Sequence, residues 1–396
     1  MNGSGGESMN THKLKLQCSI LTGLAFLMGL SQFIIIGIIN NLASSVQTSI
    51  SQVGLLVTLF AIVYAVATPI INLLVGHVYL HKVLISFFGI FAFSNLLTAV
   101  TIDYNTLLVS RVLTALSSGP SISVAITFAA AIAPSEKRAW IVSWVFSGFS
   151  IASVFGVPLG TWISDNFNWR LTFWGIFILA VILTILAYFL LPHSLRQTGN
   201  ASLDSQLKVL TDKRILWGIL LPILNFGAIY MIYTYLKPLL IYKLGFSHSW
   251  MTIILFLYGL CGLISNQISG RIANHDWLKT LGKFILLQAV SLILLSVLIK
   301  INWLALTAIL LMALTMAIQN SPVQLYYMNI AKEDYPQSLI IASSFNSIFS
   351  NVGVAIGSFA GGLVTDSLGL GFLGMFASLF SLASLGVIRV ITRNNN

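Results

Sequence analysis

Long apolar stretches alternate with short polar breaks along the whole chain. Each stretch holds about 20 residues or more, the length of helix that crosses the hydrocarbon core of a bilayer. The pattern predicts twelve membrane-spanning helices, and the expected fold class is an all-α membrane protein. The helices are expected near residues 16–41, 50–75, 83–102, 105–133, 139–163, 170–191, 215–242, 250–273, 280–300, 303–331, 338–365 and 369–391.

One polar stretch, residues 192–214, is longer than the other breaks and divides the predicted helices six and six. It predicts a linker between two six-helix bundles. The expected parts are a cytoplasmic tail, the first bundle, the cytoplasmic linker, the second bundle and a second cytoplasmic tail, at residues 1–15, 16–191, 192–214, 215–391 and 392–396.

The fifth and eleventh predicted helices repeat one spacing of glycine and aspartate. The matching residues are Gly156, Gly160 and Asp165 in one helix and Gly357, Gly361 and Asp366 in the other, each pair 201 residues apart. Internal repeats of this kind are typical of transporter folds. The spacing predicts that the two bundles are pseudo-symmetric copies of one unit.

The composition excludes several classes of protein. Hydrophobic residues make up 57% of the chain and charged residues 8%, against about a quarter charged in soluble proteins, so a soluble enzyme is excluded. The formal charge of +10 comes from basic residues in short loops beside apolar runs, where they set topology rather than bind nucleic acid. Cys18 and Cys261 lack metal-ligand spacing. We expect no nucleic-acid partner, metal or cofactor.

The basic residues also predict an orientation. With the amino terminus inside, most of the 20 Lys and Arg residues fall on the cytoplasmic face, as the positive-inside rule requires. Both termini are then cytoplasmic, and the expected location is the cell membrane.

The fifth predicted helix carries a specific string. Residues 156–161 read GVPLGT, followed by Trp169, Arg170 and Phe173, and Pro158 is expected to bend the helix between two glycines. The string resembles the antiporter signature of the major facilitator superfamily, in its drug, sugar and purine efflux branch. Resemblance to this family implies two six-helix bundles that alternate access to a central site.

Other segments resemble the same branch with departures. Residues 110–119, SRVLTALSSG, carry Ser118 where many relatives have His, and residues 258–275 keep Arg271 but carry Asn274 where Asp is usual. The loop signature at residues 75–85 is degenerate. The resemblance implies coupling and gating roles for Arg111, Gly156, Pro158, Gly160, Asp165, Arg271 and Asp366.

The resemblance also implies that the first, fourth, seventh and tenth helices surround the central cavity. Polar residues at helical spacing on these helices are therefore candidates for substrate binding. Hydrogen bonding between helices is the alternative explanation for each amide, and for Arg111 a role in coupling competes with binding of an anionic substrate group. The candidates are Gln32, Asn40, Arg111, Ser118, Asn225, Tyr233, Lys237, Gln319, Asn320 and Gln324.

No Asp or Glu lies in the interior of a predicted helix. A buried carboxylate is the usual device for binding a lipophilic cation in exchange for a proton. Its absence from the sequence pattern favours a polar substrate that is neutral, zwitterionic or anionic, such as a sugar, a purine or a metal chelator. Proton coupling then uses a group at a helix end, such as Asp103, Asp165 or Asp366, or runs through protonation of the substrate.

These observations predict a monomeric secondary transporter that exports a small polar metabolite or metal chelator, coupled to protons. A multidrug antiporter for lipophilic compounds is one alternative, because phenol faces such as that of Tyr233 attract cations by about 0.5–2 kcal/mol. A membrane sensor that transports nothing is an alternative of another class. An enzyme is not expected, since the sequence lacks clustered catalytic residues and a GxxxxGK[ST] phosphate loop.

Overall fold

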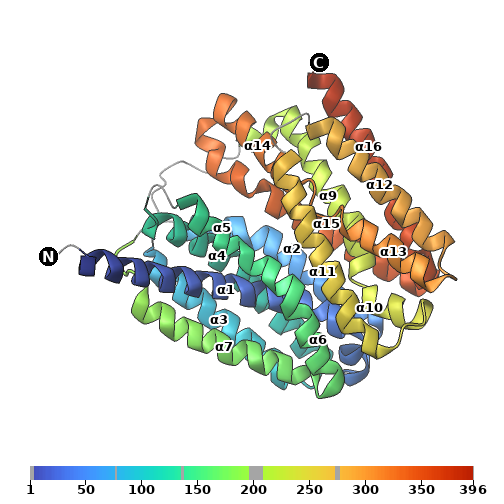
Figure 1. Cartoon of the computed structure of the whole chain (residues 1–396), viewed down its shortest axis with the longest axis horizontal. Helices are drawn as coiled ribbons and strands as arrows, with labels where there is room; N and C mark the ends of the chain where they lie inside the picture. The colour runs from blue at the N-terminus through green and yellow to red at the C-terminus, as the bar shows by residue number, and fades with distance from the viewer. Residues whose placement is uncertain (1–3, 76–77, 135–137, 196–207, 273–276, 396) are drawn as a thin grey trace. The chain divides into compact units, whose positions relative to one another are not determined.

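The computed structural model describes residues 4–75, 78–134, 138–195, 208–272 and 277–395. Within these ranges the secondary structure is helical (Figure 1). Residues 196–207 of the predicted linker lie outside the described residues. The chain forms two compact units: unit 1 comprises Met1–Ile34 and Ala67–Gly199, and unit 2 comprises Ile35–Val66 and Asn200–Asn396.

The first two helices contribute to both units, and the next five elements belong to unit 1. The shared helices are α1 (Ser4–Ser45) and α2 (Ile50–Leu74). The helices of unit 1 are α3 (Leu80–Val100), α4 (Tyr104–Ile132), α5 (Arg138–Ile151), α6 (Val157–Asn166) and α7 (Trp169–Leu190). A π-helical turn, Ala152–Gly156, joins α5 to α6.

The remaining helices belong to unit 2. They are α9 (Lys213–Tyr233), α10 (Leu236–Pro238), α11 (His248–Ile272), α12 (Trp277–Val297), α13 (Asn302–Ala313), α14 (Asn320–Asp334), α15 (Leu339–Ser367) and α16 (Leu373–Asn395).

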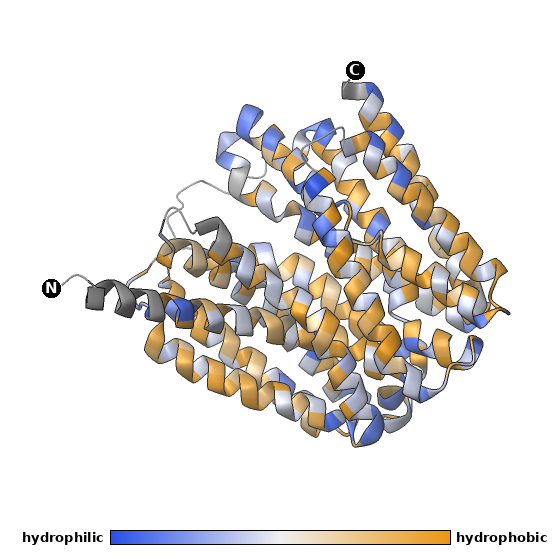
Figure 2. Ribbon diagram, in the orientation of Figure 1, coloured by the Kyte–Doolittle hydropathy of each residue, from blue (hydrophilic) through white to orange (hydrophobic). Residues whose placement is uncertain are grey.

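Each predicted range contains helix, and in the described part of the chain eleven helices are long and apolar enough to cross a membrane. Figure 2 shows that hydrophobic residues cover most of the helical surface, with hydrophilic residues gathering toward helix ends. This distribution suits helices whose middle parts face lipid or one another.

The tenth predicted helix, expected to be continuous over 303–331, is broken in the structure. It consists of the short apolar helix α13, a run of turns over residues 314–319, and α14. Within a bilayer such a break is tolerated where the freed backbone groups find partners inside the protein.

The seventh predicted helix, expected over 215–242, is also interrupted. Its α-helical part, α9, ends at Tyr233, and the chain continues through α10 into a π-helical turn at Leu239–Lys243. The interruption is anchored to α15 through one residue, because the hydroxyls of Thr234 and Ser358 lie 2.8 Å apart and the Tyr235 hydroxyl donates to the Ser358 carbonyl at 3.0 Å.

The repeated glycines of the two halves occupy equivalent places. A Cβ atom added at Gly160 in α6 would lie 2.6 Å from Cδ1 of Ile34 in α1, the first helix of its half. A Cβ atom added at Gly361 in α15 would lie 3.0 Å from the carbonyl oxygen of Met231 in α9, the first helix of the other half. Small residues allow this close approach of membrane helices. The packing supports the predicted duplication.

The repeat provides a matched pair for a packing test. A Cβ atom at Gly357 would collide with backbone atoms of Gly227, whereas one at Gly156 would meet the ends of the Leu30 and Phe26 side chains at 3.1–3.3 Å. We expect Gly357→Ala to destabilise the protein by about 1–3 kcal/mol, the usual cost of overpacking. Gly156→Ala should change stability by less than about 1 kcal/mol, because the helix propensity of alanine offsets the contact.

The measurement is the thermal melting temperature of the detergent-solubilised variants. Gly175→Ala in α7 is the control, because a Cβ atom there would meet nothing within 4 Å. Equal melting temperatures for Gly357→Ala and Gly175→Ala would contradict the packing described here.

Candidate functional site

Among the residues of unit 1 whose side chains are described, Arg111 is a buried cation. It lies on α4 two turns after Tyr104, and its side chain is 1% exposed. The guanidinium Nη1 donates a 3.0 Å hydrogen bond to the carbonyl oxygen of Ser31 in α1, and the Ser31 hydroxyl donates to Oδ1 of Asn95 in α3 at 2.7 Å. A cation inside a membrane helix costs at least about 2.5–3.5 kcal/mol. These contacts link the buried charge on α4 to polar groups of two other helices, α1 and α3.

Hydroxyl groups continue this network between α3 and α4. The Thr98 hydroxyl donates to the Ser110 hydroxyl and the Thr114 hydroxyl to that of Ser94, both at 2.9 Å. The candidate Ser118 is buried and donates to the carbonyl oxygen of Thr114 on its own helix at 2.7 Å. The candidate Gln32 is half-buried on α1, next to Ser31. Arg111 and Ser118 thus both lie on α4, which is joined to α3 by hydrogen bonds between hydroxyl groups.

The break between α13 and α14 is the corresponding polar centre of unit 2. The Ser265 and Ser269 hydroxyls of α11 accept hydrogen bonds from the backbone N–H groups of Ala317 and Ser321, both at 2.9 Å. From α9, the candidate Asn225 donates through Nδ2 to the carbonyl oxygen of Met316 at 3.0 Å. Three side chains therefore take the place of the hydrogen bonds that a continuous helix would make.

Several buried polar atoms of unit 2 have no hydrogen-bond partner in the structure. Gln319, at the start of α14, is 1% exposed, and neither atom of its amide is bonded. The same holds for Oδ1 of its neighbour Asn320, for the Tyr258 hydroxyl on α11, and for both amide atoms of Asn40 on α1. A buried polar group left unbonded costs about 1–3 kcal/mol. Such atoms are places where a ligand or water completes the bonding.

Two tyrosines of unit 2 stack on each other. The rings of Tyr233 in α9 and Tyr258 in α11 are 4.6 Å apart between centroids and tilted by 5°. Tyr258 lies seven residues before Ser265, and residues seven apart share one face of a helix. Tyr258 and Ser265 therefore lie along the same face of α11.

Two candidates lie at interruptions of helices that were expected to be continuous. Lys237 lies in α10, four residues after the end of α9 at Tyr233, and is fully buried. Gln319 lies at the break between α13 and α14, one residue before α14.

Gln324 itself is half-buried and donates through Nε2 to the Ser343 carbonyl oxygen of α15 at 2.9 Å. This contact matches the alternative explanation, a hydrogen bond between helices.

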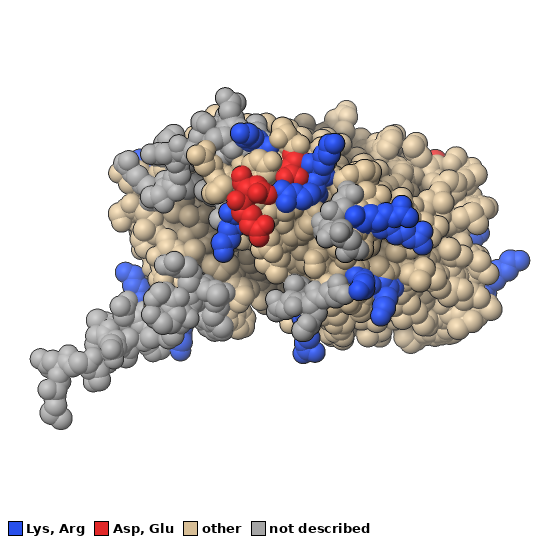
Figure 3. All heavy atoms as spheres, turned by 90° about the horizontal axis from the view of Figure 1, so that it is seen from above, with Lys and Arg blue, Asp and Glu red and all other residues tan. Residues whose placement is uncertain are grey.

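The carboxylates of the described residues lie in loops or within four residues of a helix end, and Figure 3 shows acidic side chains gathered beside basic ones on one face. Asp103 caps α4, where it accepts hydrogen bonds from the Thr106 backbone N–H at 2.9 Å and hydroxyl at 2.7 Å. These bonds hold the pKa of Asp103 below its ordinary value. Asp165 is half-buried near the end of α6, whereas Asp366 and Arg271 are exposed.

Sequence reasoning missed Ser265, Ser269 and the bonded pair of Ser31 and Asn95. A signal for the serines was present, since they lie four residues apart on α11 and thus share a face. No group of three or more His, Cys, Asp or Glu residues suited to a metal ion occurs among the described residues.

Comparison with known proteins identifies the class. The sequence model of the Major Facilitator Superfamily matches residues 21–342, and the chain belongs to this family of transporters. It is 33% identical to the MFS-type transporter YtbD of Bacillus subtilis, over 87% of each chain. It is 31% identical to the inner membrane transport protein YdhP of Escherichia coli K12, over 88% of each chain. A probable sugar efflux transporter of Helicobacter acinonychis is 29% identical over 93% of each chain.

Solved structures share the fold. A bacterial homologue of the human lysosomal transporter Spinster, in an inward-facing conformation, has a TM-score of 0.77 at 14% identity and covers 96% of this chain and 97% of its own. A D-xylose-proton symporter has a TM-score of 0.74 at 15% identity, and the match covers 93% of this chain and 96% of the symporter. The predicted fold class, an all-helical membrane protein of the major facilitator type, is confirmed, as is the assignment to transporters rather than enzymes.

Proposed function

We propose that this protein is a secondary transporter that exports a small polar metabolite, neutral, zwitterionic or anionic, by alternating access. The observation that carries the proposal is the set of buried polar atoms without partners in unit 2, above all the whole amide of Gln319. An amide offers donors and an acceptor to a ligand. A polar substrate would satisfy these atoms, whereas a wholly lipophilic one would leave them unbonded.

The distribution of charge supports the same substrate class. Arg111 and Lys237 are both buried within membrane helices, while the carboxylates of the described residues lie in loops or near helix ends. In surroundings of low dielectric constant a buried cation repels a cationic ligand and attracts an anionic one. The arrangement therefore disfavours lipophilic cations as substrates.

The direction of transport and the coupling rest on resemblance. Several relatives are named as probable sugar efflux transporters, and the GVPLGT string of residues 156–161 resembles an antiporter signature. We propose export driven by protons from a protein with both termini in the cytoplasm. The basic loops support this orientation.

Replacing Gln319 tests the proposed binding site. We expect Gln319→Leu to abolish export while leaving the melting temperature unchanged or raised, because the substitution removes a buried amide that makes no bond in the structure. The measurement compares the compounds released by cells that make the wild-type protein, the variant or neither. Compounds enriched outside wild-type cells should fall to the level of cells without the protein.

The matched control is Gln324→Leu. That amide is bonded to the Ser343 carbonyl oxygen, so its loss should lower the melting temperature and leave the exported compounds the same. If Gln319→Leu keeps full export, or if it unfolds the protein as a structural residue would, Gln319 does not bind substrate.

For proton coupling we propose Asp165, which is half-buried, in preference to the exposed Asp366. Asp103 is a poor candidate: its folded-state pKa lies below the ordinary value of about 3.9, so it stays ionised throughout pH 5–8. We expect Asp165→Asn to remove the dependence of export on the pH gradient, and Asp366→Asn and Asp103→Asn to preserve it. The measurement is export of a compound identified in the cell assay at several external pH values. An unchanged pH profile in Asp165→Asn would exclude this role.

A further inference from the structure

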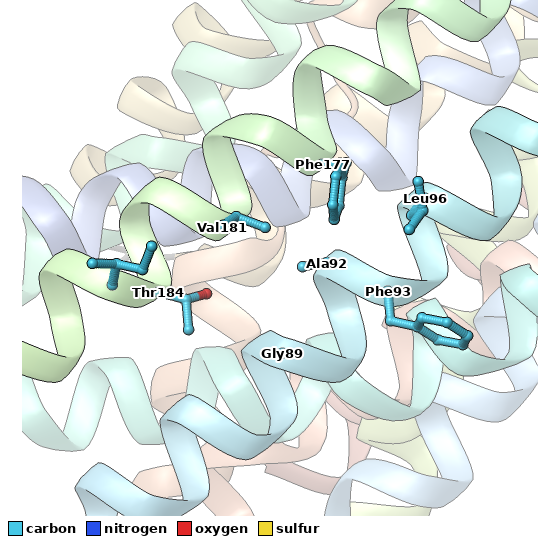
Figure 4. A pocket seen from close by; sticks show the side chains of 8 residues that line it. Gly89, Ala92, Phe93, Leu96, Phe177, Val181 and Thr184 are labelled. Carbon is cyan, nitrogen blue, oxygen red and sulfur yellow. The ribbon is translucent and has the colours of Figure 1, made fainter.

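An apolar groove lies on unit 1 between α3 and α7, which pack side by side (Figure 1). Its volume is about 240 Å³. Figure 4 shows the two walls, one from each helix. They are formed by Gly89, Ala92, Phe93 and Leu96 of α3 and by Phe177, Val181, Thr184 and Ile185 of α7.

The groove is open at Gly89, which has no side chain to fill it. The groove is also apolar, because the hydroxyl of Thr184 is already bonded within its own helix. A Cβ atom at Gly89 would meet nothing within 4 Å. The Thr184 hydroxyl donates to the carbonyl oxygen of Ala180 on its own helix at 2.7 Å. Phe93 is 56% exposed and Ile185 51%. In a chain that spans a membrane, large exposed apolar side chains at mid-helix face lipid.

A lysine, Lys82, lies on α3 beyond one end of this groove. Lys82 lies seven residues before Gly89, which places both on one face of α3 about 10 Å apart along the helix axis. Its side chain is exposed, and its ammonium lies 5.8 Å from the centre of the Tyr79 ring. Lys82 does not line the groove itself but lies about two helical turns beyond its Gly89 end, toward the beginning of α3.

Other groups at this end of unit 1 are also basic. The side chain of Gln17 donates to the carbonyl oxygen of Leu190 at 2.7 Å, which joins α1 near the exposed Lys13 and Lys15 to the end of α7. Among the unit 1 residues with described side chains, the carboxylates Asp103 and Asp165 lie beyond the opposite ends of α3 and α7. The end marked by Lys82 is thus suited to an anion.

We propose that the groove between α3 and α7 binds one acyl chain of an anionic phospholipid of the surrounding bilayer, with the lipid phosphate at Lys82. The walls provide apolar contact along a linear chain, and the ammonium provides a charge partner at the depth where the headgroup begins. Basic residues at a membrane surface attract anionic lipids in this way. The site requires only that the protein span a membrane, and it does not depend on the proposed substrate.

Native mass spectrometry of the purified full-length protein tests the site. The protein is mixed with phosphatidylglycerol and phosphatidylcholine of identical acyl chains, and the bound lipids are counted. The wild type should retain one more phosphatidylglycerol than Gly89→Leu, whose side chain fills the groove. Gly175→Leu, on α7 but outside the groove and equally open, should behave as the wild type. Lys82→Gln should lower the preference for phosphatidylglycerol about fivefold, the effect of one basic residue at an anionic surface.

Three results would overturn the proposal. Gly89→Leu retaining as much phosphatidylglycerol as Gly175→Leu would show that the groove holds no lipid. An unchanged lipid preference in Lys82→Gln would remove the charge contact. Displacement of the lipid by glycerol phosphate, which has no acyl chain, would show that a free phosphate site accounts for the binding.

Discussion

The hydrocarbon core of a bilayer supplies no hydrogen bonds, so every backbone group placed there needs a partner within the protein. Continuous helices meet this condition by themselves, and breaks in helices do not. At the break between α13 and α14, the hydroxyls of Ser265 and Ser269 and the amide of Asn225 provide the missing partners. The buried amide of Gln319, located at that break, does not meet the same condition, because neither of its polar atoms has a partner. Ligand binding would explain why an unbonded amide is kept there.

The same requirement explains which parts of the fold were predictable from sequence. Long apolar runs report helices directly, so the spans and the duplication of the halves followed from hydropathy and from the spacing of Gly156 and Gly357. The break before α14 did not, because residues 314–319 carry no proline or glycine and the turns depend on side chains of other helices. A local signal did exist in Pro322, since proline is common in the first turn of a helix.

The candidate residues stand out in the sequence by type, because polar side chains at helical spacing, such as those of Arg111, Asn225 and Tyr233, are rare in apolar segments. The positions of Lys237 and Gln319 at interruptions of their helices do not show in the apolar pattern. Nor does a sequence show which amides are already bonded: Asn225 and Gln324 have partners, whereas Gln319 has none. That difference is the reason for proposing Gln319, rather than Asn225 or Gln324, as a binding residue.

We propose that the buried charges of Arg111 and Lys237 select polar substrates that are not cationic. Inside-out vesicles energised with a proton gradient test it most directly, with a pentose, a purine nucleoside, an organic anion and ethidium as probes. We expect the wild-type vesicles to accumulate at least one polar probe, Arg111→Ala vesicles to lose this accumulation, and neither to accumulate ethidium. Proton-driven accumulation of ethidium that is unaffected by Arg111→Ala and by an excess of the polar probes would contradict it.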